Sequence, residues 1–270
     1  MDIAGFFQYA FIQKALIAGS FIAITCAALG MFLVLRKMSL IGDGLSHVSF
    51  GAIALGLFFG IYPLYIAIPV VMLGSLLILE ITKRASVYGD AAIGIVSAVG
   101  IAGGVILASL SKGFNVDLFG YLFGNILAIS ETEVFLSVAL SVIVLIVIIF
   151  FYWDLFSATF DEEYAKTTGT NIKLINALVF LLAAVTVILA VRVMGVMLVS
   201  ALLILPAVSA LQVAKKFKAA IIIAVVISLV SVLLGITVSF FADIPAGATV
   251  VMLNACFFIL ALFYKKFILR

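Results

Sequence analysis

Charged residues are scarce in this chain. Asp, Glu, Lys and Arg make up 10% of its 270 residues, whereas 67% are hydrophobic and the mean hydropathy is +1.47. A soluble domain carries about 25% charged residues, so this chain has too few to cover a surface that faces water. Its apolar runs have the length of helices and lack the short alternating pattern of barrel strands. The composition therefore predicts an all-α, polytopic integral membrane protein surrounded by lipid.

Several other features are missing. Cys26 and Cys256 are the only cysteines and both fall in apolar runs, which favours buried thiols over a disulfide. The chain has no extended basic patch and no soluble domain, so nothing predicts nucleic-acid binding. It also has no G-x4-G-K-S/T phosphate loop and cannot hydrolyse ATP by that route. If its function is driven by ATP, a separate subunit must supply the ATPase.

Apolar runs recur along the whole chain, and a spanning helix needs roughly 20 such residues. We expect about nine transmembrane helices, with about eight as the alternative count. Their expected positions are 10–35, 40–60, 62–82, 91–111, 132–155, 173–192, 194–214, 219–241 and 246–264. Residues 114–130 are apolar but too short to span, which predicts a re-entrant or interfacial segment. Residues 1–270 thus form a single transmembrane domain.

The basic residues predict the orientation of the chain. If the C-terminus, with Lys265, Lys266 and Arg270, is cytoplasmic, tracing the helices backwards puts nearly all 15 Lys and Arg residues inside. The exceptions are Lys14, Lys112 and Arg192. The positive-inside rule therefore predicts an N-terminus outside and a C-terminus inside.

The sole histidine, His47, follows Asp43 by four residues in the stretch MSLIGDGLSHVSFG. Positions four apart share a helix face, and Gly51 and Ala54 would continue that face with small side chains. A carboxylate oxygen and an imidazole nitrogen within one turn form half a site for Zn²⁺, Mn²⁺ or Fe²⁺. Because ionisable residues inside a membrane usually mark an ion path, we expect Asp43 and His47 to be metal ligands.

Two other interpretations of this pair stay open. One is a structural hydrogen bond between Asp43 and His47, and the other is a proton relay, since histidine titrates near neutral pH. Counting from Arg36 places Asp43 about 10 Å along a helix, nearer the cytoplasmic face than the midplane. A central site would require residues 36–40 to turn back into the bilayer as irregular backbone.

Asp90 is another carboxylate beside an expected helix start, in VYGDAAIG. A negative charge there suits the positive end of the helix dipole, so capping is favoured over metal binding.

The longest polar segment is FSATFDEEYAKTTGTNIK, between two strong spans on the expected cytoplasmic side. Its acidic residues from Asp161 to Glu163 favour the start of a short helix, and Gly169 favours its end. A short helix in this place can receive force from a partner subunit, or it can be a solvated connector.

Six segments in order resemble the membrane permease subunits of ABC importers for zinc, manganese or iron, almost from end to end. They are LRKMSLIGDGLSHVSFGAIALG, GDAAIGIVSAVGIAGGV, DLFGYLFGNIL, FDEEYAKTTGTN, VRVMGVMLVSALLILPAVSA and ADIPAGATVV. The resemblance implies a transporter subunit and not an enzyme, in the cytoplasmic membrane of a prokaryote. It assigns metal coordination to Asp43 and His47, and Asp90 matches a family acid. It also makes residues 156–172 a coupling loop, with contacts to the ATPase through Asp161, Glu163, Ala165 and Gly169.

The implied assembly is a permease homodimer with cytoplasmic ATP-binding subunits and an extracytoplasmic metal-binding protein. A two-fold pair would bring two half-sites toward one axis. No cofactor is expected on this chain, and the cargo is a divalent metal, with zinc favoured and manganese or iron as alternatives. The implied mechanism is alternating access, with the metal passing Asp43 and His47.

Two competing functions are compatible with parts of the sequence. A proton-coupled secondary metal transporter would use Asp43 and His47 as a relay and would need no ATPase. A permease for vitamin B12 or siderophores would share the architecture, but a large organic substrate has no need of the Asp–His pair.

Overall fold

The computed structural model describes residues 8–84, 88–110, 124, 129–196 and 198–268. Within these residues, eight helices are long and apolar enough to cross a membrane. They are α2 (Ala10–Leu35), α3 (Ile41–Phe58), α4 (Pro63–Arg84), α5 (Gly89–Leu110), α7 (Glu131–Phe150), α10 (Ile172–Met194), α12 (Phe217–Ala242) and α13 (Ala246–Ile268). The apolar helix α11 (Val199–Val213) is shorter, as are α8 (Tyr152–Phe160) and α9 (Glu162–Thr167). The predicted all-α, polytopic membrane fold is confirmed.

Two predicted helices have different bounds in the structure. The helix predicted at 132–155 is interrupted at Phe151, which separates α7 from α8. The helix predicted at 194–214 starts late, because α10 extends into its first residue and Gly195 then takes a positive φ of 81°. As a result α11 has only 15 residues. Most of the segment predicted at 114–130 lies outside the described residues.

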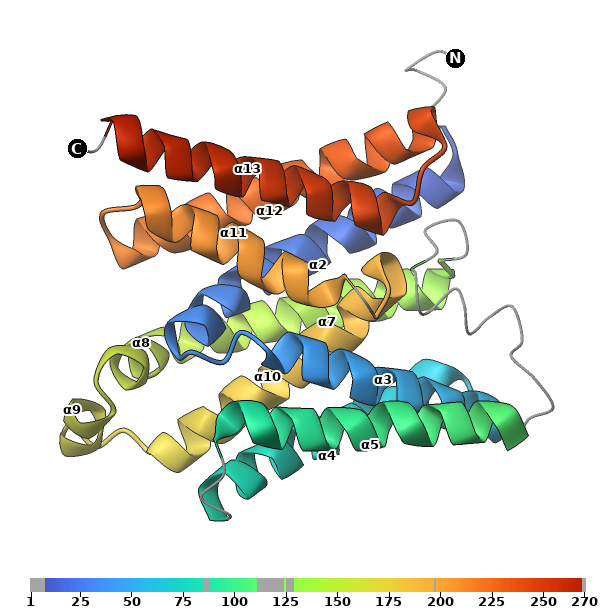
Figure 1. Cartoon of the computed structure of the whole chain (residues 1–270), viewed down its shortest axis with the longest axis horizontal. Coiled ribbons are helices and arrows are strands. Elements are labelled where there is room, and N and C mark those ends of the chain that lie inside the picture. The colour runs from blue at the N-terminus through green and yellow to red at the C-terminus, as the bar shows by residue number, and fades with distance from the viewer. Residues whose placement is uncertain (1–7, 85–87, 111–123, 125–128, 197, 269–270) are drawn as a thin grey trace.

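The long helices run roughly along the long axis of the molecule, and the start of α2 and the end of α13 lie at opposite ends (Figure 1). One of these ends, here named the α9 end, holds α8, α9 and the connections α2–α3 and α11–α12 (Figure 1). Basic residues gather at the helix ends and connections there: Lys37, Lys83, Arg84, Lys166, Lys215, Lys216, Lys218, Lys265 and Lys266.

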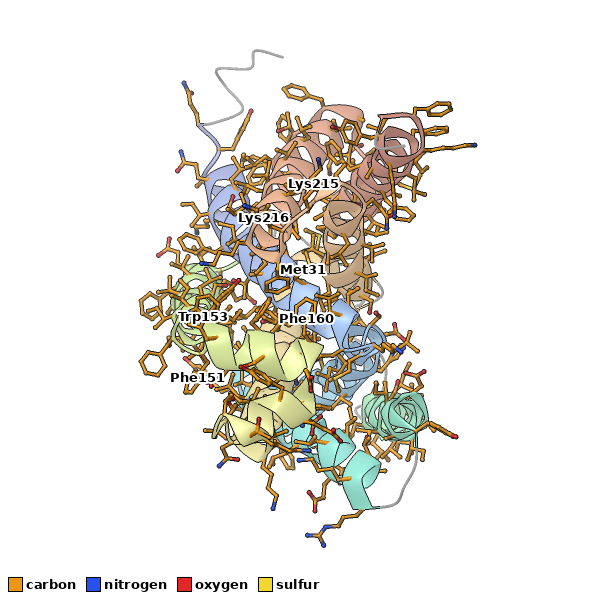
Figure 2. All side chains as sticks on the ribbon, turned by 90° about the vertical axis from the view of Figure 1, so that its left-hand side faces the viewer. Met31, Phe151, Trp153, Phe160, Lys215 and Lys216 are labelled. Carbon is orange, nitrogen blue, oxygen red and sulfur yellow. The ribbon has the colours of Figure 1, made fainter. Side chains whose placement is uncertain are left out.

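Aromatic side chains mark the α9 end as well. Figure 2 looks onto this end and shows Trp153 and Phe160 on α8, which lies across it. The Phe160 ring packs edge-on against Phe217 of α12 with centroids 5.6 Å apart, and the Lys218 Nζ lies 5.1 Å from the centre of the Trp153 ring. Aromatic rings with nearby cations are typical of the boundary between lipid and water. We therefore place this boundary along α8.

Burial divides the helices into an inner and an outer set. Most residues of α2, α3 and α10 are buried, whereas fewer than a third are buried in the spans of α5, α7 and α13. The exposed large side chains on these outer helices include Val99, Ile143, Ile146 and Leu260. Apolar side chains face outward because lipid, unlike water, solvates them without cost.

Glycines let α5 approach α3 closely. A Cβ on Gly100 would lie 2.8 Å from the Val48 Cα, and a Cβ on Gly104 would lie 2.7 Å from the Phe50 ring. Helices in membranes use such small residues, four apart, to bring their backbones together. This contact fixes the position of α3, the helix that carries Asp43 and His47.

Candidate metal site and coupling helix

The metal candidates lie on α3, whose start is set by the connection 36–40. Two backbone hydrogen bonds close the C-terminal end of α2: Met38 N donates to Leu33 O at 2.9 Å, and Lys37 N donates to Val34 O at 3.1 Å. Lys37 takes a positive φ of 59° there, which turns the chain. In Figure 1 the connection then runs from the α9 end toward the middle of the molecule, where α3 begins. The irregular backbone that a central site requires is therefore present.

Asp43 and His47 face each other on α3. The Asp43 Oδ2 lies 3.7 Å from the His47 Nε2, and the two side chains are 52% and 26% exposed. This separation exceeds the usual range of a hydrogen bond, about 2.7–3.2 Å. The His47 Nδ1 is buried and has no hydrogen-bond partner within the described residues. The Asp43 and His47 side chains thus share one face without a short hydrogen bond between them.

An open stripe surrounds this pair on an otherwise buried helix. Over Ile41–Gly56, only Asp43, His47, Gly51 and Leu55 are not buried. The stripe follows the i+4 row, which winds around the helix axis, so it reaches Leu55. Ala54, which the sequence placed on this face, is 4% exposed and belongs to the core. The prediction that Ala54 continues the open face of Asp43 and His47 is therefore wrong.

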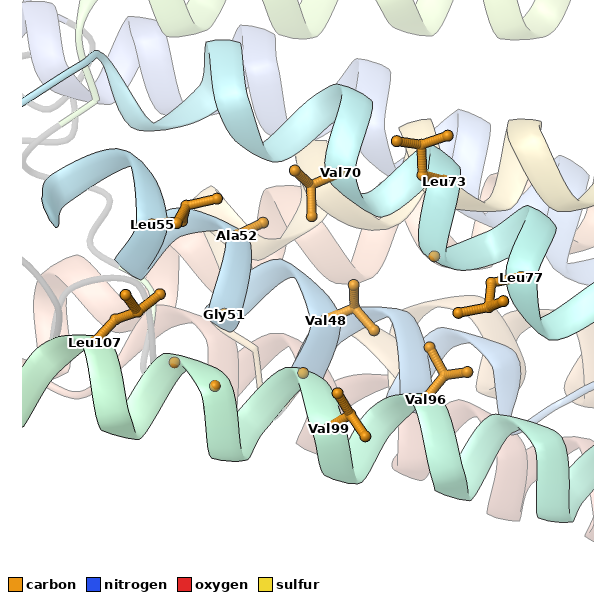
Figure 3. Close-up of a pocket in the computed structure, with 14 residues that line it drawn as sticks. Val48, Gly51, Ala52, Leu55, Val70, Leu73, Leu77, Val96, Val99 and Leu107 are labelled. Atoms are coloured by element: carbon orange, nitrogen blue, oxygen red, sulfur yellow. The ribbon is translucent and has the colours of Figure 1, made fainter. Parts of the chain in front are cut away.

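Gly51 and Leu55 of this stripe line an apolar groove of about 490 Å³ between α3, α4 and α5 (Figure 3). Val48, Leu77 and Val96 point into it in Figure 3. All of its lining residues are Gly, Ala, Val or Leu. Because these side chains offer no nitrogen, oxygen or sulfur ligand, the groove does not extend the metal site beyond His47.

Asp90 does not join this site. It lies in the first turn of α5, where a negative charge suits the helix dipole, and its side chain is exposed. Among the described residues, no group of three or more His, Cys, Asp or Glu side chains is arranged to hold a metal ion. Asp43 and His47 are therefore two candidate ligands that no third such side chain joins within the described residues.

Residues 156–172, the predicted coupling loop, contain the short helix that the sequence predicts. The Asp161 side chain caps α9 by accepting a hydrogen bond from Tyr164 N at 2.9 Å. Gly169 takes a φ of 89° after the helix, and Thr170 N donates back to Ala165 O at 3.0 Å. Ala165 is fully buried, whereas Asp161 and Glu163 are exposed. α9 is thus attached on one side and presents acidic side chains to its surroundings at the α9 end.

Sequence reasoning missed the role of Arg36, which it counted only as a basic residue of a loop. The side chain is more than half buried, and its Nη1 donates to Asn176 Oδ1 on α10 at 2.8 Å. Its Nε donates to Thr159 Oγ1 on α8 at 3.0 Å. The only signal in the sequence was an arginine directly before the segment that carries the metal candidates.

Comparison with known proteins identifies the family of the chain. Residues 8–265 match the ABC 3 transport family. The manganese transport system membrane protein MntC of Halalkalibacterium halodurans is 32% identical over 258 residues, covering 96% of this chain and 88% of the relative. The high-affinity zinc uptake system membrane protein ZnuB of Haemophilus influenzae is 35% identical over 256 residues, covering 93% of this chain and 97% of the relative.

A solved structure of similar sequence has the same fold. PsaBC from Streptococcus pneumoniae in complex with Fab superposes with a TM-score of 0.88 at 31% identity, covering 98% of this chain and 96% of that chain. The family match confirms the resemblance to metal permeases and the expectation of a transporter component that is not itself an enzyme. The chain is therefore a member of the ABC 3 transport family.

Proposed function

We propose that this chain is the permease subunit of an ATP-driven importer of divalent transition-metal ions, with Asp43 and His47 as the transient ligands of the ion. The observation that carries this proposal is the exposure of Asp43, whose side chain is 52% exposed on a spanning helix. A carboxylate on such a helix is too costly to face lipid. It therefore faces a water-filled path or a second protein surface, and both are features of a transport site.

A second copy of the chain is the partner we propose for this half-site. Two ligands are too few to strip and hold a divalent ion, which usually takes four or more. A two-fold axis beside α3 would bring two Asp43–His47 pairs to one ion. An incomplete or loosely shared site also releases its ion readily, as transport requires.

The proposed cycle uses both ends of the molecule. We place the α9 end in the cytoplasm, because its basic residues satisfy the positive-inside rule, and this puts the N-terminus outside. An extracytoplasmic binding protein delivers the ion at the opposite end. ATP-binding subunits dock on α9 through the exposed residues Asp161, Glu163 and Gly169, whereas the predicted contact through Ala165 is replaced by packing of Ala165 against the rest of this chain. Their ATP cycle moves α9 and opens the path from His47 toward the cytoplasm.

Zinc is the cargo we propose. Imidazole nitrogen suits Zn²⁺ better than Mn²⁺, which prefers oxygen ligands, and the general affinity order also places zinc above manganese. The relatives named for manganese and for zinc are similar to this chain to nearly the same degree. A competition between the two ions is therefore part of the test.

The test is metal uptake into vesicles that contain the permease with its ATP-binding subunits. We expect uptake of Zn²⁺ to require ATP and to be lost in His47→Ala, while the complex stays assembled. Leu55→Ala is the matched control, because Leu55 lies on the same open stripe but has no ligand atom. Excess Mn²⁺ should compete weakly.

Three results would contradict parts of this proposal. Normal uptake by His47→Ala would remove the metal role from the Asp43–His47 pair. Uptake that persists without ATP and follows a proton gradient would favour the secondary transporter instead. Stronger competition by Mn²⁺ than by unlabelled Zn²⁺ would make manganese the cargo and leave the permease function intact.

A further inference from the structure

Arg36 links the start of the metal-bearing segment to both sides of the coupling helix. Its Nε donates to Thr159 Oγ1 and its Nη1 donates to Asn176 Oδ1. Thr159 is next to the last residue of α8, directly before α9, and Asn176 lies in the second turn of α10, directly after the coupling loop. The two acceptors therefore bracket α9 in the chain, and any displacement of α9 acts on at least one of them.

A short backbone segment that is fixed by hydrogen bonds connects Arg36 to α3, the helix that carries the metal candidates. Arg36 caps α2, and the connection is tied by the bond from Met38 N to Leu33 O at 2.9 Å. Ile41 N, at the start of α3, donates to Met38 O at 3.1 Å. Such a bonded turn transmits a pull on Arg36 to the first turn of α3, which carries Asp43.

The surroundings of Arg36 leave room for this movement. A pocket of about 530 Å³ borders these bonds, and its lining includes Arg36 and Met38 of the connection together with Thr159, Glu162 and Asn176. The Arg36 Nη2 is buried and has no hydrogen-bond partner within the described residues. Burial lowers the pKa of Arg36, and the nearby carboxylate of Glu162 on α9 raises it. The guanidinium stays charged, so its free donor is available to an acceptor that moves closer.

We propose that Arg36 is the positioning residue that couples movement of α9 to the start of α3, by holding Thr159 of α8 and Asn176 of α10 to the connection 36–40. The inference rests on the proposed transport function and deepens it. Arginine suits this task because its planar fork makes two directed bonds to separate helices at once. Glu162 supplies an alternative acceptor in the same pocket for a displaced state of α9.

The test compares metal transported per ATP hydrolysed in the assembled transporter. Thr159→Val removes one acceptor at nearly constant shape, and Arg36→Met removes both bonds. We expect the ratio to fall by about tenfold or more in Arg36→Met, which loses two charge-assisted hydrogen bonds, and by less in Thr159→Val, which loses one. Thr82→Val is the matched control, because Thr82 lines the same pocket but donates to Ile78 O at 2.8 Å.

Two further variants separate coupling from folding. Adding Thr159→Val to Arg36→Met should lower the ratio no further, because the bond is already absent. Arg36→Lys should restore the ratio in part, since lysine keeps the charge but lacks the fork. If Arg36→Met fails to assemble, Thr159→Val and Asn176→Leu each test one bond alone.

The inference is overturned if Thr159→Val and Arg36→Met, or the single-bond variants, couple like wild type. It is also overturned if Thr82→Val lowers the ratio as much as Thr159→Val does. A wild-type complex without ATP-dependent metal uptake would overturn the proposed function and this inference together. Intact wild-type uptake with unchanged coupling in the variants overturns the inference alone.

Discussion

The connection 36–40 and the first two turns of α3 are adjacent in the chain but differ in how their polar side chains are satisfied. In the connection, Arg36 finds acceptors on α8 and on α10 within the same chain. In α3, Asp43 and His47 lie 3.7 Å apart and join no third ligand among the described residues. The charge of Arg36 therefore has hydrogen-bond partners within the chain, whereas the Asp43–His47 pair is joined by no third candidate ligand among the described residues.

This difference separates two uses of a charge in a membrane protein. Desolvation offsets most of the attraction in a buried polar network, so the bonds of Arg36 fix a position more than they add stability. A charge without such partners is costly unless water or a ligand completes its shell. We therefore interpret Arg36 as part of the framework and Asp43 with His47 as the place where the cargo binds.

The largest effect should come from removing the charge in the open region. Asp43→Asn keeps the shape of the side chain but takes one unit of negative charge away from a divalent ion. At short range in a partly buried site that interaction is strong, so we expect metal uptake at low concentration to fall by about tenfold or more. The measurement is the initial rate of uptake over a range of metal concentrations.

Asp90→Asn is the matched control for this change, because Asp90 is also an exposed carboxylate near a helix start and lies on the neighbouring helix α5. We expect it to transport like wild type. An equal loss of uptake in both variants would show that Asp90 shares the metal path, and the contrast between the two regions would then extend to α5.

A smaller effect should come from displacing α3 without changing a ligand. In Gly100→Ala the new Cβ would lie 2.8 Å from the Val48 Cα and 3.2 Å from the His47 carbonyl oxygen. Because backbone atoms must shift, we expect a loss of about 1–3 kcal/mol in stability, together with reduced uptake. Thermal unfolding of the purified permease in detergent measures the first, and vesicle uptake measures the second.

Gly103→Ala provides the comparison, since a Cβ at Gly103 meets nothing within 4 Å. Alanine is favoured over glycine in a helix by about 0.5–1 kcal/mol, so this variant should be at least as stable as wild type. A Gly100→Ala variant with unchanged stability and uptake would mean that the close contact between α3 and α5 does not position His47.

Local chemistry made much of this molecule predictable. Long apolar runs predicted the spanning helices, and the i, i+4 spacing predicted that Asp43 and His47 share a face. Asp161 and Gly169 predicted both ends of α9 because capping depends on a side chain or a φ angle within the same turn. These features need only information from neighbouring residues, which the sequence contains.

Features that depend on packing escaped prediction. The break at Phe151 interrupts a continuous apolar run, and nothing in its composition marks it. The acceptors of Arg36 lie 123 and 140 residues away in the chain, so no local pattern identifies them. Ala54 was misplaced because packing against neighbouring helices decides which row of α3 stays open, the i+4 row and not the i+3 position of Ala54, and spacing alone does not give this.

The smallest expected effect concerns the shape of the connection. Lys37 has a φ of 59° in the hydrogen-bonded turn that ends α2. Gly60 and Gly169, with φ values of 66° and 89°, occupy the equivalent places after α3 and α9. A side chain in this left-handed region costs roughly 1–2 kcal/mol. Glycine removes that cost but adds freedom to the unfolded chain, so we expect Lys37→Gly to gain about 0.5–1 kcal/mol in stability.

Lys37→Ala separates the backbone from the charge, because alanine keeps the left-handed strain but removes the cation. A gain in unfolding temperature for Lys37→Gly without one for Lys37→Ala would assign the effect to the backbone. Metal transported per ATP should stay at the wild-type value in both, since Arg36 keeps Thr159 and Asn176. A lower ratio in Lys37→Gly alone would mean that the rigidity of the turn, and not only the bonds of Arg36, carries the movement to α3. A lower ratio in both variants would place part of that task on the Lys37 charge, and the connection would then no longer contrast with α3 as a region completed within the fold.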